Sequence, residues 1–165
     1  EFLQSFSYNI GNLNERIKLC KICHCFTDIS SHESCIICDE DSRNKNIICI
    51  LQKPSDVILF ERTGYNGLYH ILGNLLSPID GINEEDLNIE SLLLRLSSDS
   101  NIEEVIIATD ASIEGDSTAL LISDTLKDYP VKVTRLARGL PIGGTIEHVD
   151  QTTLSSSIDD RIEIK

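Results

Sequence analysis

The sequence predicts an α/β fold, in which a mainly parallel sheet is flanked by helices and has a small four-cysteine module on its N-terminal side. Short β-branched apolar runs alternate with segments of helical periodicity, as in sheets built from strand–helix–strand units. One such run stops at Asp110 and is followed by an acidic turn and a helical pattern. Two Cys-x-x-Cys pairs precede the first run. These three observations divide the chain into a compact module and a larger sheet domain.

The composition is that of an ordinary globular protein. The 165 residues are enough for one α/β domain with a small appendage, and 41% of them are hydrophobic, so a packed core is feasible. No apolar run approaches the length that spans a bilayer, and no signal peptide is visible. We therefore expect a soluble, cytoplasmic protein with no membrane partner. The chain contains no methionine, so we also expect it to be a fragment or a processed form.

The charge is strongly negative and unevenly distributed. The formal net charge is −13, of which residues 54–165 carry −12 and residues 1–53 only −1. An acidic body repels phosphate backbones, which disfavours unaided binding of nucleic acid by the larger part of the chain. The same charge suits docking to a basic protein partner.

The chain begins with an apolar stripe of loosely helical spacing over residues 2–19, interrupted by Gly11. We expect residues 1–18 to be the helical tail of a longer N-terminal region.

The next segment, residues 19–45, carries two cysteine pairs, with eleven residues between the pairs. Four thiolates at this spacing suit tetrahedral zinc, and a closed four-cysteine site is structural because it leaves no open coordination position. So short a stretch buries too little apolar surface to fold alone, and metal binding would supply the missing free energy. The predicted ligands are Cys20, Cys23, Cys35 and Cys38. The spare candidates, which we interpret as bystanders, are His24, Cys25 and His32.

The first half of the sheet domain contains two predicted strands. The first covers residues 47–51, where Cys49 is interpreted as a small core residue, and the second covers residues 68–72. A helix between them begins after Pro54 and stops at Gly64. A loop rich in glycine and proline follows over residues 73–82.

The second half repeats the alternation. Residues 84–96 predict one amphipathic helix, whose core side consists of Leu87, Leu92, Leu93 and Leu96. Strands over residues 105–110 and 131–137 enclose a helix, and its apolar spacing is marked by Ala119, Leu120, Ile122 and Leu126. A turn at residues 141–144 and a final short helix at 151–158 complete the chain.

The acidic turn between the third strand and its helix carries the candidate site residues Asp110, Glu114 and Asp116. In open α/β sheets, ligands bind at the carboxyl ends of the strands, so these carboxylates are expected at one sheet edge. Three carboxylates there indicate a hard-cation site, a general acid/base site or an acidic docking face. Alternatively, Glu114 and Asp116 only stabilise the positive end of the helix dipole.

Several motifs together resemble the bacterial recombination mediator family RecR, over nearly all of the chain. They are the four-cysteine module, Ile47-Ile-Cys49-Ile50 with Pro54, Glu61-Arg-Thr-Gly64, Gly67-Leu-Tyr-His70-Ile-Leu-Gly73, Leu76-Ser-Pro-Ile-Asp80-Gly-Ile, Ala108-Thr109, Glu114-Gly115, Ala119, Val133-Thr-Arg135-Leu-Ala137-Arg-Gly-Leu-Pro141-Ile-Gly143-Gly144, Thr153-Leu-Ser155 and Arg161.

The resemblance implies a zinc finger (19–45), a Toprim domain (46–139) and a C-terminal arm used in assembly (140–165). It also implies a non-catalytic, ring-forming homo-oligomer that acts on nucleoid DNA as part of a complex. In that role it works with RecO and RecF to load recombinase onto single-stranded DNA at gaps. The family begins with a helix-hairpin-helix region, of which residues 1–18 resemble only the tail. Our candidate DNA contacts are Arg16, Lys18 and Lys21.

Toprim enzymes, by contrast, place one Glu at the end of the first strand and an Asp-x-Asp pair at a later one, for magnesium binding and acid/base chemistry. This sequence has Gln52 at the first position and Asp110-Ala-Ser112 at the second. Glutamine cannot shuttle a proton, and serine is a poor magnesium ligand. We therefore expect no enzyme and at most a weakly bound Mg²⁺. The alternatives are a Toprim-type magnesium-dependent nuclease, primase or topoisomerase fragment, and a free-standing zinc-ribbon adaptor.

Overall fold

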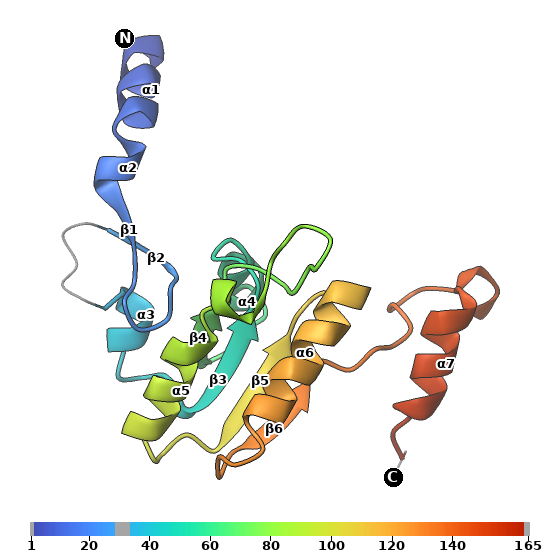
Figure 1. Ribbon diagram of the computed structural model, residues 1–165. Coiled ribbons are helices and arrows are strands. Elements are labelled where there is room, and N and C mark those ends of the chain that lie inside the picture. The colour runs from blue at the N-terminus through green and yellow to red at the C-terminus, as the bar shows by residue number, and fades with distance from the viewer. Residues whose placement is uncertain (1, 29–33, 164–165) are drawn as a thin grey trace. The chain divides into compact units, whose positions relative to one another are not determined.

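A computed structural model describes residues 2–28 and 34–163 of the chain (Figure 1). The chain divides into two compact units, residues 1–134 and 135–165, and each is described by itself. No helix among the described residues is both long and apolar enough to cross a membrane.

The first unit is built on a four-stranded sheet in the order β4-β3-β5-β6. These strands are β3 (Asn44–Leu51), β4 (Gly67–Ile71), β5 (Glu104–Ala108) and β6 (Lys132–Arg135). The central strand β3 pairs in parallel with both neighbours, and its Ile50 lies opposite His70 on one side and Ile107 on the other. The predicted, mainly parallel α/β sheet is therefore confirmed.

The two faces of the sheet pack against different parts of the chain, because side chains alternate along a strand. Ile48 and Ile50 belong to a core that includes side chains of α5 (Ile89–Ser98) and α6 (Ile113–Thr125). Figure 1 shows these two helices together on one face. Cys49 and Leu51 belong to a second cluster, which contains Val57 of α4 (Asp56–Glu61) and the N-terminal cysteines.

Two predicted helices differ from the structure. The predicted helix over 84–96 is interrupted, with a 3-10 turn η1 (Glu84–Asp86) followed by α5. The interruption arises at Leu87, whose extended backbone lets its side chain enter the core. Asn83 and Asp86 form a capping box that closes the turn.

The predicted helical stripe over residues 2–19 was wrong at its C-terminal end. Helices α1 (Phe2–Gly11) and α2 (Leu13–Arg16) are followed by a strand, β1 (Ile17–Leu19). This strand pairs in an antiparallel manner with β2 (Phe26–Asp28). The β-branched Ile17 has an extended backbone, and the hairpin pairing satisfies groups that a helix would otherwise have paired.

The second unit contains η2 (Ile146–His148) and α7 (Gln151–Asp159). The predicted turn before them is present: Gly144 N–H donates to the carbonyl of Pro141, and Gly143 has a φ of +82°. The carboxylate of Asp150 caps α7 by accepting from the backbone N–H of Thr153 at 2.9 Å.

Candidate metal centre and acidic sheet edge

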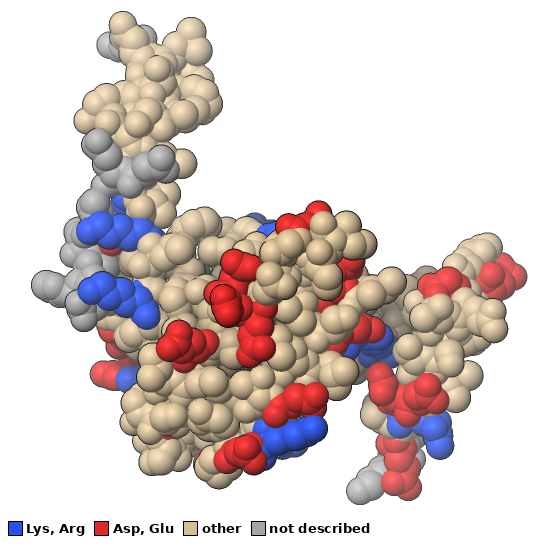
Figure 2. Space-filling model, in the orientation of Figure 1, with Lys and Arg blue, Asp and Glu red and all other residues tan. Residues whose placement is uncertain are grey.

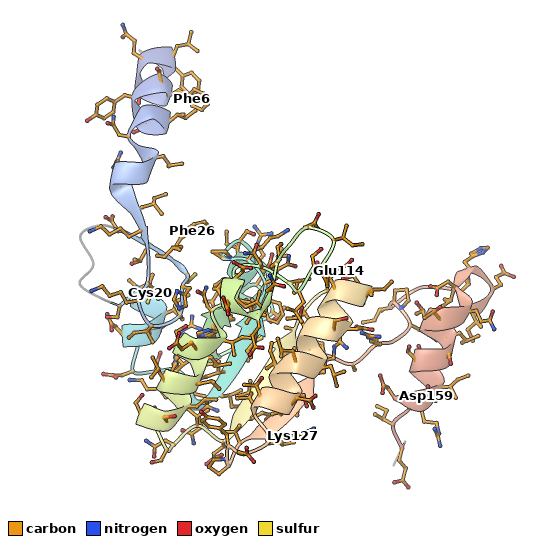
Figure 3. All side chains as sticks on the ribbon, viewed as in Figure 1. Phe6, Cys20, Phe26, Glu114, Lys127 and Asp159 are labelled. Carbon is orange, nitrogen blue, oxygen red and sulfur yellow. The ribbon has the colours of Figure 1, made fainter. Side chains whose placement is uncertain are left out.

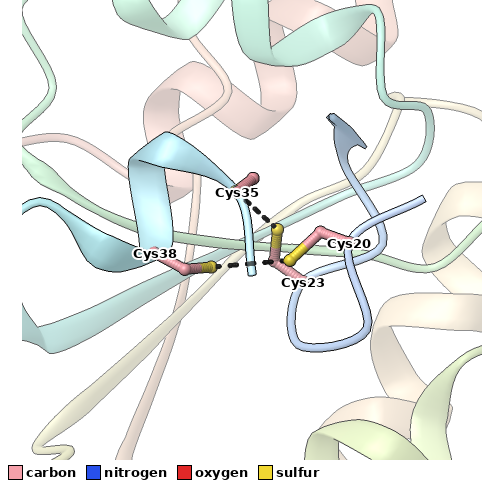
Figure 4. Close-up of side chains that lie close together, drawn as sticks. All are labelled: Cys20, Cys23, Cys35 and Cys38. Atoms are coloured by element: carbon pink, nitrogen blue, oxygen red, sulfur yellow. Dashed lines mark hydrogen bonds between the residues drawn. The ribbon is translucent and has the colours of Figure 1, made fainter. Parts of the chain in front are cut away.

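The four predicted ligand cysteines lie together (Figure 4). Cys20 follows β1, Cys23 lies in the hairpin turn, and α3 (Ile36–Asp39) has Cys35 as its N-cap and contains Cys38. The Sγ atoms are all within 4.8 Å of one another, with separations of 3.6 Å for Cys23–Cys35 and 4.0 Å for Cys20–Cys38. Tetrahedral zinc with Zn–S bonds of about 2.3 Å separates the sulfurs by about 3.8 Å. The geometry therefore fits a tetrahedral metal ion.

Backbone turns prepare this arrangement. The N–H of His24 donates to the carbonyl of Cys20 at 2.9 Å, and the N–H of Cys20 donates to the carbonyl of Cys25 at 2.8 Å. His24 adopts a φ of +60°, an uncommon conformation for a residue with a side chain. The tight turn aims the sulfurs of Cys20 and Cys23 at the second pair.

The clustered thiols differ from a core thiol in their neighbours and not in their burial. Cys20, Cys23 and Cys35 are at most 2% exposed. Cys49, in β3, is equally buried at 1% exposed, but it lies outside the four-sulfur group. Burial raises the pKa of the Cys49 thiol to about 12. Cys49 is therefore a neutral core residue.

The spare histidine and cysteine lie outside the four-sulfur group. Cys25 is buried nearby, and His24 directs Nε2 to the hydroxyl of Ser91 at 2.8 Å. His32 lies outside the described residues. His24 therefore helps to fix the position of the module relative to α5.

The cysteine module covers the open edge of the sheet. The N–H of Ile71 in the edge strand β4 donates to the carbonyl of Cys23 at 2.8 Å. The rings of His24 and His70 pack edge to face, with 5.4 Å between the ring centroids. His70 is fully buried, and its Nε2 lies 2.7 Å from the carbonyl oxygen of Asn88. The module and the sheet thus share one buried interface.

A second connection centres on Arg43, to which the sequence analysis assigned no role. Its guanidinium forms a two-pronged contact with the carboxylate of Glu61, at 2.9 and 2.5 Å, and also donates to the carbonyl of Gly67. Tyr69 donates its hydroxyl to the same carboxylate at 2.6 Å. Arg43 lowers the pKa of Glu61, and Glu61 raises that of Arg43. This network ties the end of the module to α4 and β4.

The acidic turn closes tightly onto the start of α6. Ser112 is the N-cap, and its Oγ accepts from the N–H of Gly115 at 3.0 Å. A Cβ on Gly115 would lie 2.0 Å from the carbonyl oxygen of Asp110, so only glycine fits there. Asp110 and Glu114 are exposed, and Figure 3 places Glu114 at the beginning of α6.

The structure does not group the acidic turn as metal ligands. Within residues 2–28 and 34–163, the group of Cys, His, Asp and Glu side chains placed to hold a metal is the four-cysteine cluster. Asp110, Glu114 and Asp116 do not form a second one. The edge is acidic, but its carboxylates are spread along the turn and the first helical residues.

Comparison with known proteins matches the sheet domain and the C-terminal segment to known families. The family model of the Toprim domain matches residues 46–137, and the model "RecR, C-terminal" matches residues 139–162. The recombination protein RecR of Cytophaga hutchinsonii is 41% identical over 159 residues, which cover 96% of this chain and 76% of that protein. The chain belongs to the RecR family.

Two other relatives support the same family assignment. RecR of Chlorobaculum parvum is 39% identical over 91% of this chain and 74% of its own length, and RecR of Chloroherpeton thalassium is 39% identical over 99% and 82%. The predicted Toprim fold and the RecR resemblance are confirmed, and the relatives are named recombination proteins. The chain thus belongs to a family of recombination proteins, and it combines a Toprim sheet with a group of four cysteines that could hold a metal ion.

The candidate DNA contacts of this RecR-family chain lie on and beside the hairpin. Arg16 ends α2, Lys18 lies within β1 and Lys21 lies in the turn, and all three are exposed. Arg16 also donates to the side-chain oxygen of Asn9 at 3.1 Å. Figure 2 shows basic side chains on this part of the chain. Their role stays a prediction.

Proposed function

We propose that this chain is a non-catalytic mediator of recombinational DNA repair, which acts with RecO and RecF to load recombinase onto single-stranded DNA at gaps. The names of its relatives support the repair role. The acidic body, with a net charge of −12 over residues 54–165, supports recruitment through proteins over direct binding of a phosphate backbone.

The observation that carries the proposal is the replacement of acid groups at the sheet edge. Gln52 follows β3, where a Toprim enzyme has its Glu, and its backbone carbonyl accepts from the N–H of Gly73. Ser112, in place of the second Asp, uses its hydroxyl as a helix cap. An amide and a capping hydroxyl supply neither the general acid nor the magnesium ligands of phosphodiester chemistry.

We infer that the remaining carboxylates of this edge bind RecO. The double substitution Glu114→Ala and Asp116→Ala should weaken RecO affinity about tenfold, by removing two charges from a docking contact. Calorimetric titration of RecO into the zinc-loaded chain measures this affinity. Asp159→Ala with Asp160→Ala, at the end of α7, is the matched control with the same change of charge. Equal affinity of the acidic-edge variant and the unmodified chain would contradict the inference.

We further propose that the metal is Zn²⁺, one ion per chain, and that its role is structural. Four sulfurs at tetrahedral separations leave no position for water or substrate. The proposed organisation is an N-terminal tail (1–18) that contains α1 and α2, the zinc finger (19–45), the Toprim domain (46–139) and an assembly arm (140–165) in a homo-oligomer. The family matches to 46–137 and 139–162 support the last two boundaries.

DNA contact is proposed only within the complex on the nucleoid, through Arg16, Lys18 and Lys21. Three exposed cations within six residues form a local exception to the acidic body. If each contacts a phosphate, replacing all three by Ala should reduce the salt dependence of DNA binding by the assembled complex by about three counterions. An unchanged salt slope would remove these residues from the interface.

The second candidate is a Toprim-type nuclease, primase or topoisomerase fragment. It is favoured by the position of Asp110 two residues after the end of β5, at the sheet edge where Toprim enzymes bind magnesium. This candidate requires magnesium-dependent chemistry on DNA that is lost in Asp110→Asn.

A further inference from the structure

A hollow of about 560 Å³ opens between η1 and the first turns of α5. We call it the glutamate groove, and its lining residues are Asn83, Glu84, Glu85, Leu87, Ile89, Glu90 and Leu93. Leu87 and Ile89 are at most 5% exposed, and Leu93 is partly buried against the same core. The three glutamates are exposed. The groove therefore has an apolar floor and an acidic rim, and its volume lies within the range of about 300–1,000 Å³ that is typical of ligand sites.

The rim charges are not used by the fold. The neighbouring Asp86 has an internal role, because its carboxylate accepts from the backbone N–H of Asn83 at 2.9 Å. Glu84, Glu85 and Glu90, by contrast, form no ion pair among the residues that the structure describes. Figure 2 shows acidic side chains gathered near the N-terminal end of α5. The helix dipole accounts for one carboxylate in the first turn of α5, but not for an apolar floor beside three of them.

The groove lies at the same edge of the sheet as Asp110, but next to a different strand. The N–H of Asn88, just before α5, donates to the carbonyl of Leu72 at 3.0 Å, which fixes the groove at the carboxyl end of β4. Asp110 follows β5, and β3 lies between β4 and β5. The groove is therefore a separate surface, and its occupancy does not depend on whether the acidic turn binds RecO.

From this geometry we infer that the glutamate groove binds an amphipathic segment of a partner protein, in which lysine or arginine side chains flank apolar ones. An apolar side chain of the segment would pack on the partly buried Leu93, above the core side chains of Leu87 and Ile89, and the cations would pair with the rim. This is the helix-in-groove mode of recognition. Charge selects the occupant: an acidic rim repels nucleic acid, and a second copy of this chain would bring its own net charge of −13.

The test uses the full, zinc-loaded chain and a fluorescent helical peptide with leucines on one face and lysines on the others. Binding is followed by anisotropy. We expect saturable binding that weakens at least about tenfold in the triple variant Glu84→Gln, Glu85→Gln and Glu90→Gln. A peptide of the same spacing with glutamate in place of lysine should not bind. The matched control, Glu147→Gln with Asp159→Asn and Asp160→Asn, changes the net charge equally and should bind as the unmodified chain does.

The apolar floor is tested separately. Leu93→Ser should weaken binding, whereas Leu94→Ser, at an exposed position of the same helix, should not. Equal weakening by the two triple variants would reduce the interaction to general electrostatics and overturn the proposal, as would equal binding of a peptide with serine in place of leucine. Self-association that is lost only in the groove triple variant would assign the groove to a second copy and would also overturn it.

Discussion

Replacing Arg43 should loosen the joint between the cysteine module and the sheet. Its side chain is 8% exposed and that of Glu61 is 36% exposed, so the pair lies between a buried and a surface ion pair. Removing one partner of a buried pair costs about 3–5 kcal/mol, and an exposed pair is worth about 0.2–1 kcal/mol. Arg43→Met keeps most of the apolar stem but leaves Glu61 with only the Tyr69 hydroxyl. We therefore expect a loss of roughly 2 kcal/mol of unfolding free energy.

Urea unfolding of the zinc-loaded chain, followed by circular dichroism, measures this loss. Lys45→Met is the matched control, because its pair with Asp41 joins side chains that are 44% and 95% exposed. That substitution should cost less than about 0.5 kcal/mol. The loss of unfolding free energy in Arg43→Lys should lie between these two values, since an ammonium cannot form the two-pronged contact. If Arg43→Met and Lys45→Met were equally mild, the network would not support the joint.

Three further predictions concern the fold. Gly115→Ala should destabilise the chain by about 2 kcal/mol in urea, because the new Cβ would overlap the Asp110 carbonyl; an effect near zero would show that this turn can widen. Burial lowers the pKa of His70 to about 4, so the histidine of the unfolded chain takes up a proton at a higher pH than that of the folded chain. The free energy of unfolding should therefore fall by roughly 3 kcal/mol as the pH drops from about 6.5 to 4. In His70→Gln the pH dependence should flatten, and an unchanged slope would contradict the assignment. Cys38→Ser should release zinc to a chromogenic chelator faster than the unmodified chain, whereas Cys49→Ser should retain it, and equal release would contradict the ligand set.

The parts of the fold that the sequence could predict are those set by local patterns. The spacing within and between the cysteine pairs was sufficient to group four sulfurs that the structure brings within 4.8 Å. Alternation of β-branched runs with amphipathic segments was sufficient for the parallel strands, because strands joined by helices pair side by side in one direction.

The parts that it could not predict depend on distant partners. Ile17 and Leu19 suit a helical stripe as well as a strand, and only pairing with Phe26–Asp28 decides between them. Arg43 received no role from the sequence because its partners, Glu61 and Gly67, lie about twenty residues further along the chain. The capping role of Ser112 had a local signal, since Ser directly before a helical pattern is a preferred N-cap residue.

The proposed mediator role depends most on the loss of phosphodiester chemistry at the sheet edge. The direct measurement incubates the purified, zinc-loaded chain with supercoiled plasmid and magnesium, beside an Asp110→Asn variant prepared identically. The account predicts that both leave the plasmid as intact as buffer does. Cleavage by the unmodified chain that persists through purification and disappears in Asp110→Asn would contradict it.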